Sequence, residues 1–259
     1  MKIAALYDIH GNLPALESVI EVIKKVEPDH IVIGGDVVAG PMPVECLNTL
    51  KALSEKYPMS FIHGNAESEV LRALAGEAPN GFSERNDDIA QWVASKLSEE
   101  HIEWIKSWTL TKSIISNTGD DILFCHATPQ NDVDIFTSNS PDEKVESFFE
   151  GISNTFVVCG HTHIQVDRQL ANTRVLNAGS VGMSFSAQGA HWLIIDHEDL
   201  SFNHTKYNLV DAAARIRETD YPFADDFADN NVLSNPSTSK ALDMLNALAE
   251  KQEAERVSA

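Results

Sequence analysis

Side chains that can bind metal ions or transfer protons stand directly after five short apolar runs of this sequence. They are Asp8 and His10 after Ile3–Tyr7, Asp36 after Ile31–Ile33, Asn65 after Phe61–Ile62, His126 after Asp121–Cys125, and His161 and His163 after Thr155–Cys159. We interpret each run as a buried strand. In open α/β sheets, ligands bind beyond the carboxyl ends of the strands. We therefore expect these side chains to converge on one crevice.

The spacing within this set supports convergence. Asp8 and His10 are two residues apart, and so are His161 and His163. On an extended segment, residues two apart point to the same side. Each pair is therefore expected to present both of its side chains to the crevice.

The chemistry of the set points to two metal ions. Imidazole nitrogens mixed with carboxylate and amide oxygens suit manganese, iron, zinc or nickel better than calcium or magnesium alone. The number of ligands exceeds what one catalytic ion with an open position uses, so we expect two ions that share a carboxylate. Asp36 is the expected bridge, because it stands alone on a glycine-flanked turn. Taken singly, Gly-Gly-Asp is usually a turn and His126 would more often be a core residue. The conjunction at successive strand ends favours the metal site.

Composition restricts the partners of such a site. The 259 residues include 39 acidic and 19 basic side chains, which leaves a formal net charge of -20. This charge repels nucleic acids, so binding through phosphate contacts is not expected. Two divalent ions would reverse the sign locally after Asp8, Asp36 and a shared hydroxide are counted. We therefore expect a small phosphoester as the substrate, while the oligomeric state stays open.

Cysteines and targeting signals indicate the compartment. The chain has three cysteines and no CxxC pair, so a disulfide framework is excluded. We find no signal-peptide pattern at the N-terminus and no apolar stretch of roughly 18 residues for a membrane span. We predict a cytoplasmic location without membrane attachment.

The first part of the chain alternates apolar runs with amphipathic segments. Helices are predicted over Leu13–Val26 and Val44–Leu53, between the first three strands. This β-α-β-α-β order implies right-handed crossovers and a parallel sheet covered by helices. Residues 67–108 are predicted to be mostly helical with a break near 78–81, and form either an inserted helical cap or a plain packing layer. A further helix is predicted over Pro141–Ile152, with Ser140 as its N-cap.

After residue 165 the pattern changes to closely spaced strands separated by turns. These strands are Val166–Leu170, Arg174–Asn177, His191–Asp196 and Ser201–Asn208, and we predict that they form a second sheet rich in hairpins. A short helix is predicted over Asp211–Arg217 and a terminal helix near Lys240–Arg256. The terminal helix carries Leu242, Leu245 and Leu248 on one side, which would let it dock on the body or on a partner.

The polar blocks together resemble the calcineurin-like metallophosphoesterase superfamily. The resemblance runs through Asp8-x-His10, Gly35-Asp36, Gly64-Asn65, His126 and Gly160-His161-x-His163, over roughly residues 1–182. The segment 177–182 is similar to the small bacterial phosphodiesterase-like branch. This resemblance implies an α/β fold of the α+β type, a four-layer αββα sandwich of two mixed sheets flanked by helices, with a dinuclear metal site at the sheet edge. We predict one metallophosphoesterase domain over residues 1–210, with a helical insertion near 67–108, and a C-terminal helical extension, 211–259, packed on the same domain.

The resemblance also implies how the ligands divide. Asp8, His10 and His163 would hold one ion, and Asn65, His126 and His161 the other, with Asp36 bridging. The expected cofactors are two divalent metal ions, manganese first, with iron, zinc or nickel as alternatives. The reaction would be hydrolysis of a phosphodiester or activated phosphoester by a hydroxide that bridges the two ions.

One position departs from the family pattern. Many members carry a histidine directly after the motif asparagine, where it protonates the leaving group, but this chain has Ala66 there and Glu67 next. The catalytic acid is therefore unassigned, with Glu67, His63 or a metal-bound water as candidates, and His63 is expected to face away from the site. General acid catalysis contributes ~10²–10⁴-fold, so good leaving groups should be favoured.

Two other functions stay open at this stage. A catalytically weak scaffold of the same fold could serve for protein binding, and the missing acid and the terminal helix favour it. A binuclear hydrolase of amides or lactams is the other alternative, and inhibition by inorganic phosphate would distinguish it from a phosphoesterase.

Overall fold

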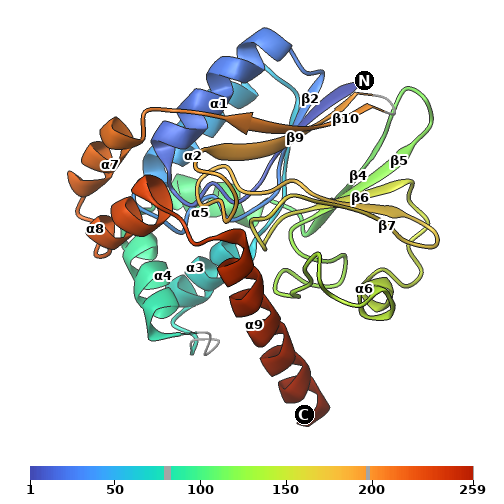
Figure 1. Ribbon diagram of the computed structural model, residues 1–259. Coiled ribbons are helices and arrows are strands. Elements are labelled where there is room, and N and C mark those ends of the chain that lie inside the picture. The colour runs from blue at the N-terminus through green and yellow to red at the C-terminus, as the bar shows by residue number, and fades with distance from the viewer. Residues whose placement is uncertain (79–82, 197–198, 259) are drawn as a thin grey trace.

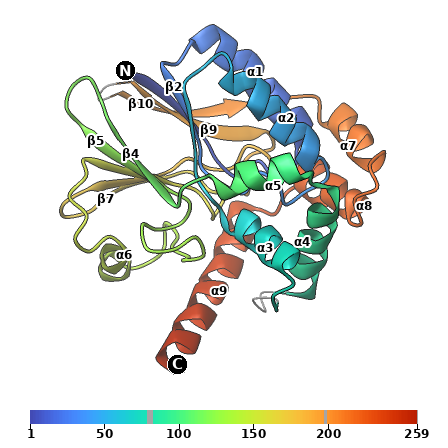
Figure 2. The same ribbon diagram turned by 180° about the vertical axis from the view of Figure 1, so that it is seen from behind.

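Two mixed β-sheets pack face to face, and helices cover the outer face of each sheet (Figures 1 and 2). The computed structural model describes residues 1–78, 83–196 and 199–258. Apolar side chains of both sheets, among them Tyr7, Val32, Phe124 and Val158, meet in one core between the sheets. The predicted four-layer αββα sandwich is confirmed.

The first sheet has the strand order β10-β9-β1-β2-β3. Its strands are β1 (Lys2–Leu6), β2 (His30–Ile33), β3 (Met59–Phe61), β9 (Ala190–Asp196) and β10 (Asp199–Thr205). The three N-terminal strands are parallel and are joined by the helices α1 (Leu13–Val26) and α2 (Pro43–Ser54), as predicted. The side chain of Asn12 begins α1 by accepting a hydrogen bond from the backbone N–H of Ala15.

The second sheet has the strand order β4-β5-β6-β8-β7. Its strands are β4 (Thr111–Ile115), β5 (Asp121–Cys125), β6 (Phe156–Cys159), β7 (Val166–Gln169) and β8 (Arg174–Asn177). The prediction that all strands after residue 165 form one second sheet is wrong. The hairpin of β7 and β8 completes this sheet, whereas the hairpin of β9 and β10 extends the first sheet. β9 pairs with β1 because its central residues are buried on both faces, which suits a position inside a covered sheet.

The segment after β3 is helical, as predicted, and contains α3 (Asn65–Ala75), α4 (Glu84–Lys96) and α5 (Glu99–Lys106). Most of the predicted break near 78–81 lies outside the described residues. Val70, Val93 and Ile105 of these helices belong to the same core as α1 and α2. The segment is therefore a packing layer of the sandwich.

The helix predicted over Pro141–Ile152 is shorter than expected. It forms α6 (Asp142–Phe148), with Pro141 at the N-cap position and no side-chain cap. The prediction that Ser140 is the N-cap is wrong, because the Ser140 hydroxyl accepts a hydrogen bond from the Thr137 N–H in the preceding turn. Gly151, with a φ of 79°, turns the chain away soon after the helix ends.

The C-terminal part contains α7 (Leu209–Arg217), α8 (Ala224–Phe227), the π-helix η1 (Ala228–Leu233) and α9 (Thr238–Ser258). α9 runs away from the two sheets toward the C-terminus (Figures 1 and 2). Its buried side chains are Ala241, Leu245 and Ala249, which pack with Ile135 and Ile164. The prediction of a Leu242, Leu245 and Leu248 stripe is wrong at Leu248, which is 45% exposed, because the buried positions follow a four-residue spacing.

None of the helices in the described part of the chain has the length and apolar character needed to cross a bilayer. The domain division at residue 210 stays a prediction, although Ala212, Ala213 and Ile216 of α7 pack into the same core as α1.

Candidate metal centre

The two sheets bring the seven predicted side chains to one end of the sandwich. Asp8 and His10 follow β1, Asp36 follows β2, Asn65 begins α3 after β3, His126 follows β5, and His161 and His163 follow β6. Among the described residues, two groups have ligand atoms within 4.8 Å of one another, namely Asp8, His10, Asp36 and His163, and Asp36, His126 and His161. Asp36 belongs to both groups, which is the geometry of a bridging carboxylate.

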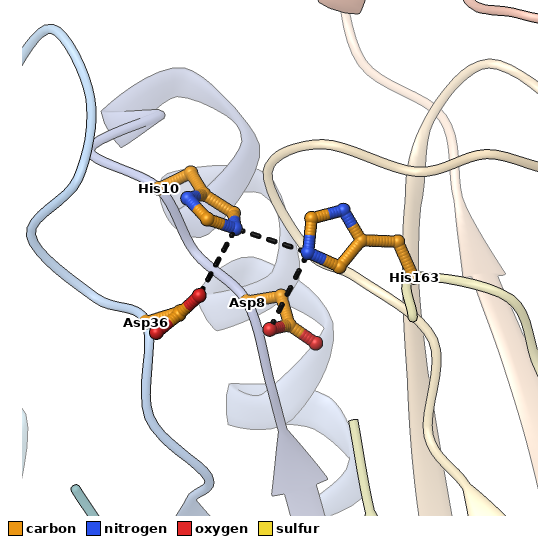
Figure 3. Close-up of side chains that lie close together, drawn as sticks. All are labelled: Asp8, His10, Asp36 and His163. Carbon is orange, nitrogen blue, oxygen red and sulfur yellow. Dashed lines mark hydrogen bonds and ion pairs between the residues drawn. The ribbon is translucent and has the colours of Figure 1, made fainter. Parts of the chain in front are cut away.

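The first group joins residues from both sheets (Figure 3). The Nε2 atoms of His10 and His163 are 3.1 Å apart. His163 Nε2 lies 3.5 Å from Asp8 Oδ1, and His10 Nε2 lies 3.7 Å from Asp36 Oδ2. Two ring nitrogens and two carboxylates therefore face one small volume.

The second group lies on the other side of Asp36. His126 Nε2 is 3.5 Å from Asp36 Oδ1 and 3.9 Å from Asp8 Oδ1. Asn65 Oδ1 lies 3.2 Å from the same nitrogen, and the His161 ring meets the His126 ring edge to face at 5.2 Å. The structure thus brings Asn65 to this group, as predicted.

Backbone carbonyls orient two of the imidazoles. The Nδ1 atom of His10 lies 3.1 Å from the Ala39 carbonyl oxygen, and the Nδ1 atom of His126 lies 2.8 Å from that of Gly34. These acceptors hold a proton on Nδ1, so Nε2 is the atom that faces the carboxylates and that can bind a metal once it is deprotonated, as in histidines that bind metals.

Most of the predicted ligands have left-handed backbone conformations. Outside glycine, positive φ occurs at six described residues, of which five are predicted ligands: Asp8 at 55°, His10 at 48°, Asp36 at 52°, His161 at 67° and His163 at 58°. Such conformations cost about 1–3 kcal/mol each and cluster at functional sites. The extended pairs expected from the spacing are therefore wrong in backbone detail, since both residue pairs turn sharply after their strands.

Close approach explains two of the glycines that precede ligands. A Cβ atom at Gly64 would lie 2.3 Å from Asp36 Oδ1, and one at Gly160 would lie 2.5 Å from Asp8 Oδ2. Any other residue at these positions would displace a carboxylate of the centre.

The buried environment sets the charge of the imidazoles. Burial and the nearby His126 lower the pKa of His161 to about 4, and burial and His163 lower the pKa of His10. Both rings are therefore neutral near pH 7 and can donate lone pairs. Burial opposes protonation of His126 too, but Asp36 and Asp8 outweigh it and raise the pKa of His126.

One carboxylate oxygen of the centre is buried without a hydrogen bond from the described part of the chain. Asp8 is fully buried, and its Oδ1 atom has no hydrogen-bond partner among the described residues. Burial raises the pKa of Asp8, yet the nearby imidazoles of His163 and His126 bring it down to about 2. A buried ionised oxygen without a partner is costly unless a cation meets it. The donor set therefore fits two divalent ions that share Asp36.

Glu67 links two turns of the site through hydrogen bonds to their backbone. Its carboxylate accepts hydrogen bonds from the backbone N–H groups of Asp36, Val37, Val38 and Gly64, at 2.8–3.2 Å. Burial and the Asp36 charge raise the pKa of Glu67 to about 7, against these donors. Because both oxygens are occupied by backbone donors and the side chain is fully buried, Glu67 is poorly placed as the catalytic acid.

We expect Glu67→Gln to destabilise the fold by about 2 kcal/mol, because the amide NH₂ then faces backbone donors and leaves them unpaired. Urea unfolding measures the change as a lower midpoint at constant slope. Glu103→Gln is the control, since it removes only the exposed pair with Lys106 and should cost less than about 1 kcal/mol. Equal effects of the two substitutions would contradict the bracing role of Glu67.

His63 is bonded away from the predicted ligands. Its Nε2 lies 3.0 Å from the carbonyl oxygen of Ile105 in α5, and its ring meets Trp108 edge to face. Burial lowers the pKa of His63, so the ring is neutral near pH 7. A neutral ring that donates to a backbone carbonyl has no proton ready for a leaving group.

Several positioning residues were not identified from the sequence. The Ser180 hydroxyl donates to the Asp8 carbonyl at 2.7 Å, and Asn177 Nδ2 donates to the Gly160 carbonyl at 2.6 Å. Both lie in the segment 177–182, which begins at the last residue of β8. The motif in that segment was the available signal, because these side chains tie it to the turns that carry Asp8 and His161.

Comparison with known proteins places this geometry in a family. Residues 1–200 match the family model of the calcineurin-like phosphoesterase superfamily domain. An uncharacterized protein of Methanocaldococcus jannaschii is 27% identical over 241 residues, which cover 85% of this chain and 93% of that protein.

Two solved structures have the same fold. A hypothetical protein of Pyrococcus horikoshii OT3 has a TM-score of 0.76 at 18% identity, and the match covers 88% of this chain and 97% of that one. A metallophosphoesterase of Sphaerobacter thermophilus has a TM-score of 0.69 at 20% identity, with 90% and 98% covered.

Proposed function

Because the chain belongs to the calcineurin-like phosphoesterase superfamily, we propose that it is a metal-dependent phosphoesterase acting on phosphodiesters or activated phosphoesters. The observation that carries this proposal is the pair of ligand groups that share Asp36 at one end of the sandwich. Asp8, His10 and His163 would hold one ion, and Asn65, His126 and His161 the other. Two such ions lower the pKa of a shared water and neutralise charge on the phosphoryl oxygens.

The side chains of this protein prepare the site for that chemistry. The carbonyls of Ala39 and Gly34 fix the tautomers of His10 and His126, so that their free nitrogens face the centre. Asp36 is held by the Ala66 N–H, which donates to its Oδ1 at 2.8 Å. Since the position after Asn65 contributes only this backbone N–H, it supplies no proton to a leaving group.

Substrate class, metal and location are part of the proposal. The net charge of -20 supports a small phosphoester over a nucleic acid. Manganese is the metal we propose, and the cytoplasm the compartment. Elemental analysis of protein purified without added metal tests the metal assignment. We expect two equivalents of a first-row divalent metal.

We expect the manganese-loaded protein to hydrolyse bis(p-nitrophenyl) phosphate at least about 10²-fold faster than ethyl phosphate in kcat/KM. The reason is that an alkoxide leaving group needs an acid, worth ~10²–10⁴-fold, whereas nitrophenolate does not. Steady-state kinetics on the two esters measure the ratio.

Para-nitrophenyl phosphate serves as the control, because it combines the good leaving group with a monoester. Comparable rates on ethyl phosphate and on the aryl diester would mean that another group supplies the proton. A metal-loaded protein inactive on every ester would instead favour a binding scaffold.

A further inference from the structure

A cavity of about 430 Å³ lies between α3 and the segment after α5. Its walls include His63, Ser68, Leu71, Arg72, Trp108 and Leu110. This volume is in the range of small-molecule sites. We propose that this cavity, called here the α3 cavity, binds an uncharged aromatic ester substituent of the phosphoester substrate. This inference rests on the proposed function.

The position of the α3 cavity connects it to the reaction. His63 and Ser68 flank Asn65 in the chain, and Asn65 lies at the His126 side of the centre. Ser68 also donates to Asp132 at 2.6 Å, which joins α3 to the loop after β5. A phosphate bound at Asn65 and His126 would therefore have the cavity within reach of one ester substituent.

Aromatic packing makes the wall of the cavity rigid. The Trp108 ring stacks on Phe61 with centroids 5.2 Å apart and meets Trp104 edge to face at 5.5 Å. The indole of Trp108 is held on one side by these rings and is only 7% exposed, so it forms a fixed part of the wall with little accessible surface of its own. Leu71 and Leu110 add apolar surface, so a planar apolar group fits this wall.

An unpaired donor specifies the chemistry further. The Trp108 Nε1 atom is buried and has no hydrogen-bond partner among the described residues. Buried indole N–H groups usually have an acceptor. An acceptor on the occupant, such as a nitro or carbonyl oxygen, would supply it.

The charges around the cavity exclude a second anionic group. Arg72 is the cation in the wall, but its Nη1 lies 2.6 Å from Glu69 Oε2, so its charge is offset. Glu77 also lines the cavity and adds a negative charge. An uncharged substituent is therefore favoured over a second phosphate or a carboxylate.

Leu110→Trp tests the cavity by narrowing it. Leu110 is 63% exposed, so the larger side chain can enter the cavity without disturbing the core. We expect KM for bis(p-nitrophenyl) phosphate to rise about tenfold, while KM for methyl ethyl phosphate, which has no ring, changes less than about twofold. Leu74→Trp on α3 is the matched control, because Leu74 is 40% exposed and is not part of the cavity wall.

Nuclear magnetic resonance of the metal-free protein supplies a readout that does not need activity. We expect 4-nitrobenzyl alcohol to shift the Trp108 indole N–H signal, and 1-butanol to leave it unchanged. Trp108→Phe, which keeps an aromatic ring but removes the indole N–H donor, assigns the signal. The shift should be lost in Leu110→Trp and kept in Leu74→Trp.

The two proposals fail in different ways. An unchanged Trp108 signal, together with equal KM effects of Leu110→Trp on both esters, would overturn the α3 cavity and leave the phosphoesterase intact. A shifted signal without hydrolysis of any ester would support the cavity and overturn the proposed function.

Discussion

Asp36→Asn is expected to lower kcat for bis(p-nitrophenyl) phosphate by about 10³-fold and to reduce the bound metal below two equivalents. Asp36 is the one side chain shared by both ligand groups, with its two oxygens 3.5 Å from His126 Nε2 and 3.7 Å from His10 Nε2. Loss of one preorganised group that stabilises charge costs ~10²–10³-fold, and this carboxylate serves both ions.

The substitution is chosen so that the fold survives. Asp36 has a φ of 52°, and asparagine tolerates the left-handed region about as well as aspartate. The amide oxygen can still accept the hydrogen bond from the Ala66 N–H. The loss should therefore come from the missing charge, and circular dichroism should match the wild type.

Asp88→Asn is the control, because it removes an equal charge from an exposed position of α4. It should retain activity within about twofold and two equivalents of metal. A fully active Asp36→Asn protein with both metals bound would contradict the bridging role.

The N-terminal helices and strands could be predicted because the sequence patterns that specify them are local. α1 has the predicted bounds, Leu13–Val26, since apolar residues with helical spacing lie between the capping Asn12 and the chain reversal after Val26. The predicted ligands converge because parallel strands bring their carboxyl ends to one edge.

The assignment of hairpins to sheets could not be predicted. β7 with β8 and β9 with β10 show similar strand patterns, yet the two hairpins join different sheets. Their partners, β6 and β1, are distant in sequence, and strand pattern alone carries no information on which edge is free. The spacing of apolar residues along a helix can likewise predict the wrong buried face, as the exposed Leu248 of α9 shows.

The finer features of the site depend on tertiary contacts. The left-handed backbone of His161 and His163 is not visible in residue type, because only a minority of histidines adopt it even though histidine is enriched there. Glu67 was identified only as a departure from a motif, since its four backbone donors come from two separate turns. The α3 cavity arises where α3 meets Trp108, which are more than thirty positions apart.

Metal ions are expected to raise the melting temperature by about 10–20 °C at pH 8, and by clearly less at pH 6. A ligand present at a hundred times its Kd raises the free energy of unfolding by about 2.7 kcal/mol, and two occupied sites raise it by about twice that. For a chain of this size, 1 kcal/mol corresponds to about 2–4 °C. Differential scanning calorimetry with and without manganese measures the increment at each pH.

The pH dependence follows from groups whose pKa is raised in the folded protein without metal. These are His126, raised above its ordinary value of about 6.5, and Glu67, raised to about 7. A raised pKa stabilises the fold at low pH, and that stabilisation is lost as the pH rises through the folded pKa. His10 and His161 have lowered pKa values, so the stability that they contribute grows as the pH rises through about 6.5 and offsets part of this loss. The protons on His126 and Glu67 therefore stabilise the metal-free centre more at pH 6 than at pH 8.

Metal binding offsets the stability that is lost when these protons leave. Cations at Asp36 and Asp8 would replace the proton on His126, and they would offset the carboxylate charge that raises the pKa of Glu67. The increment should thus grow with pH across this window. Asp36→Asn should show a smaller increment at both pH values, whereas Asp88→Asn should match the wild type. An increment that stays constant with pH, or that survives in Asp36→Asn, would mean that the ions bind the acidic surface instead of the buried centre.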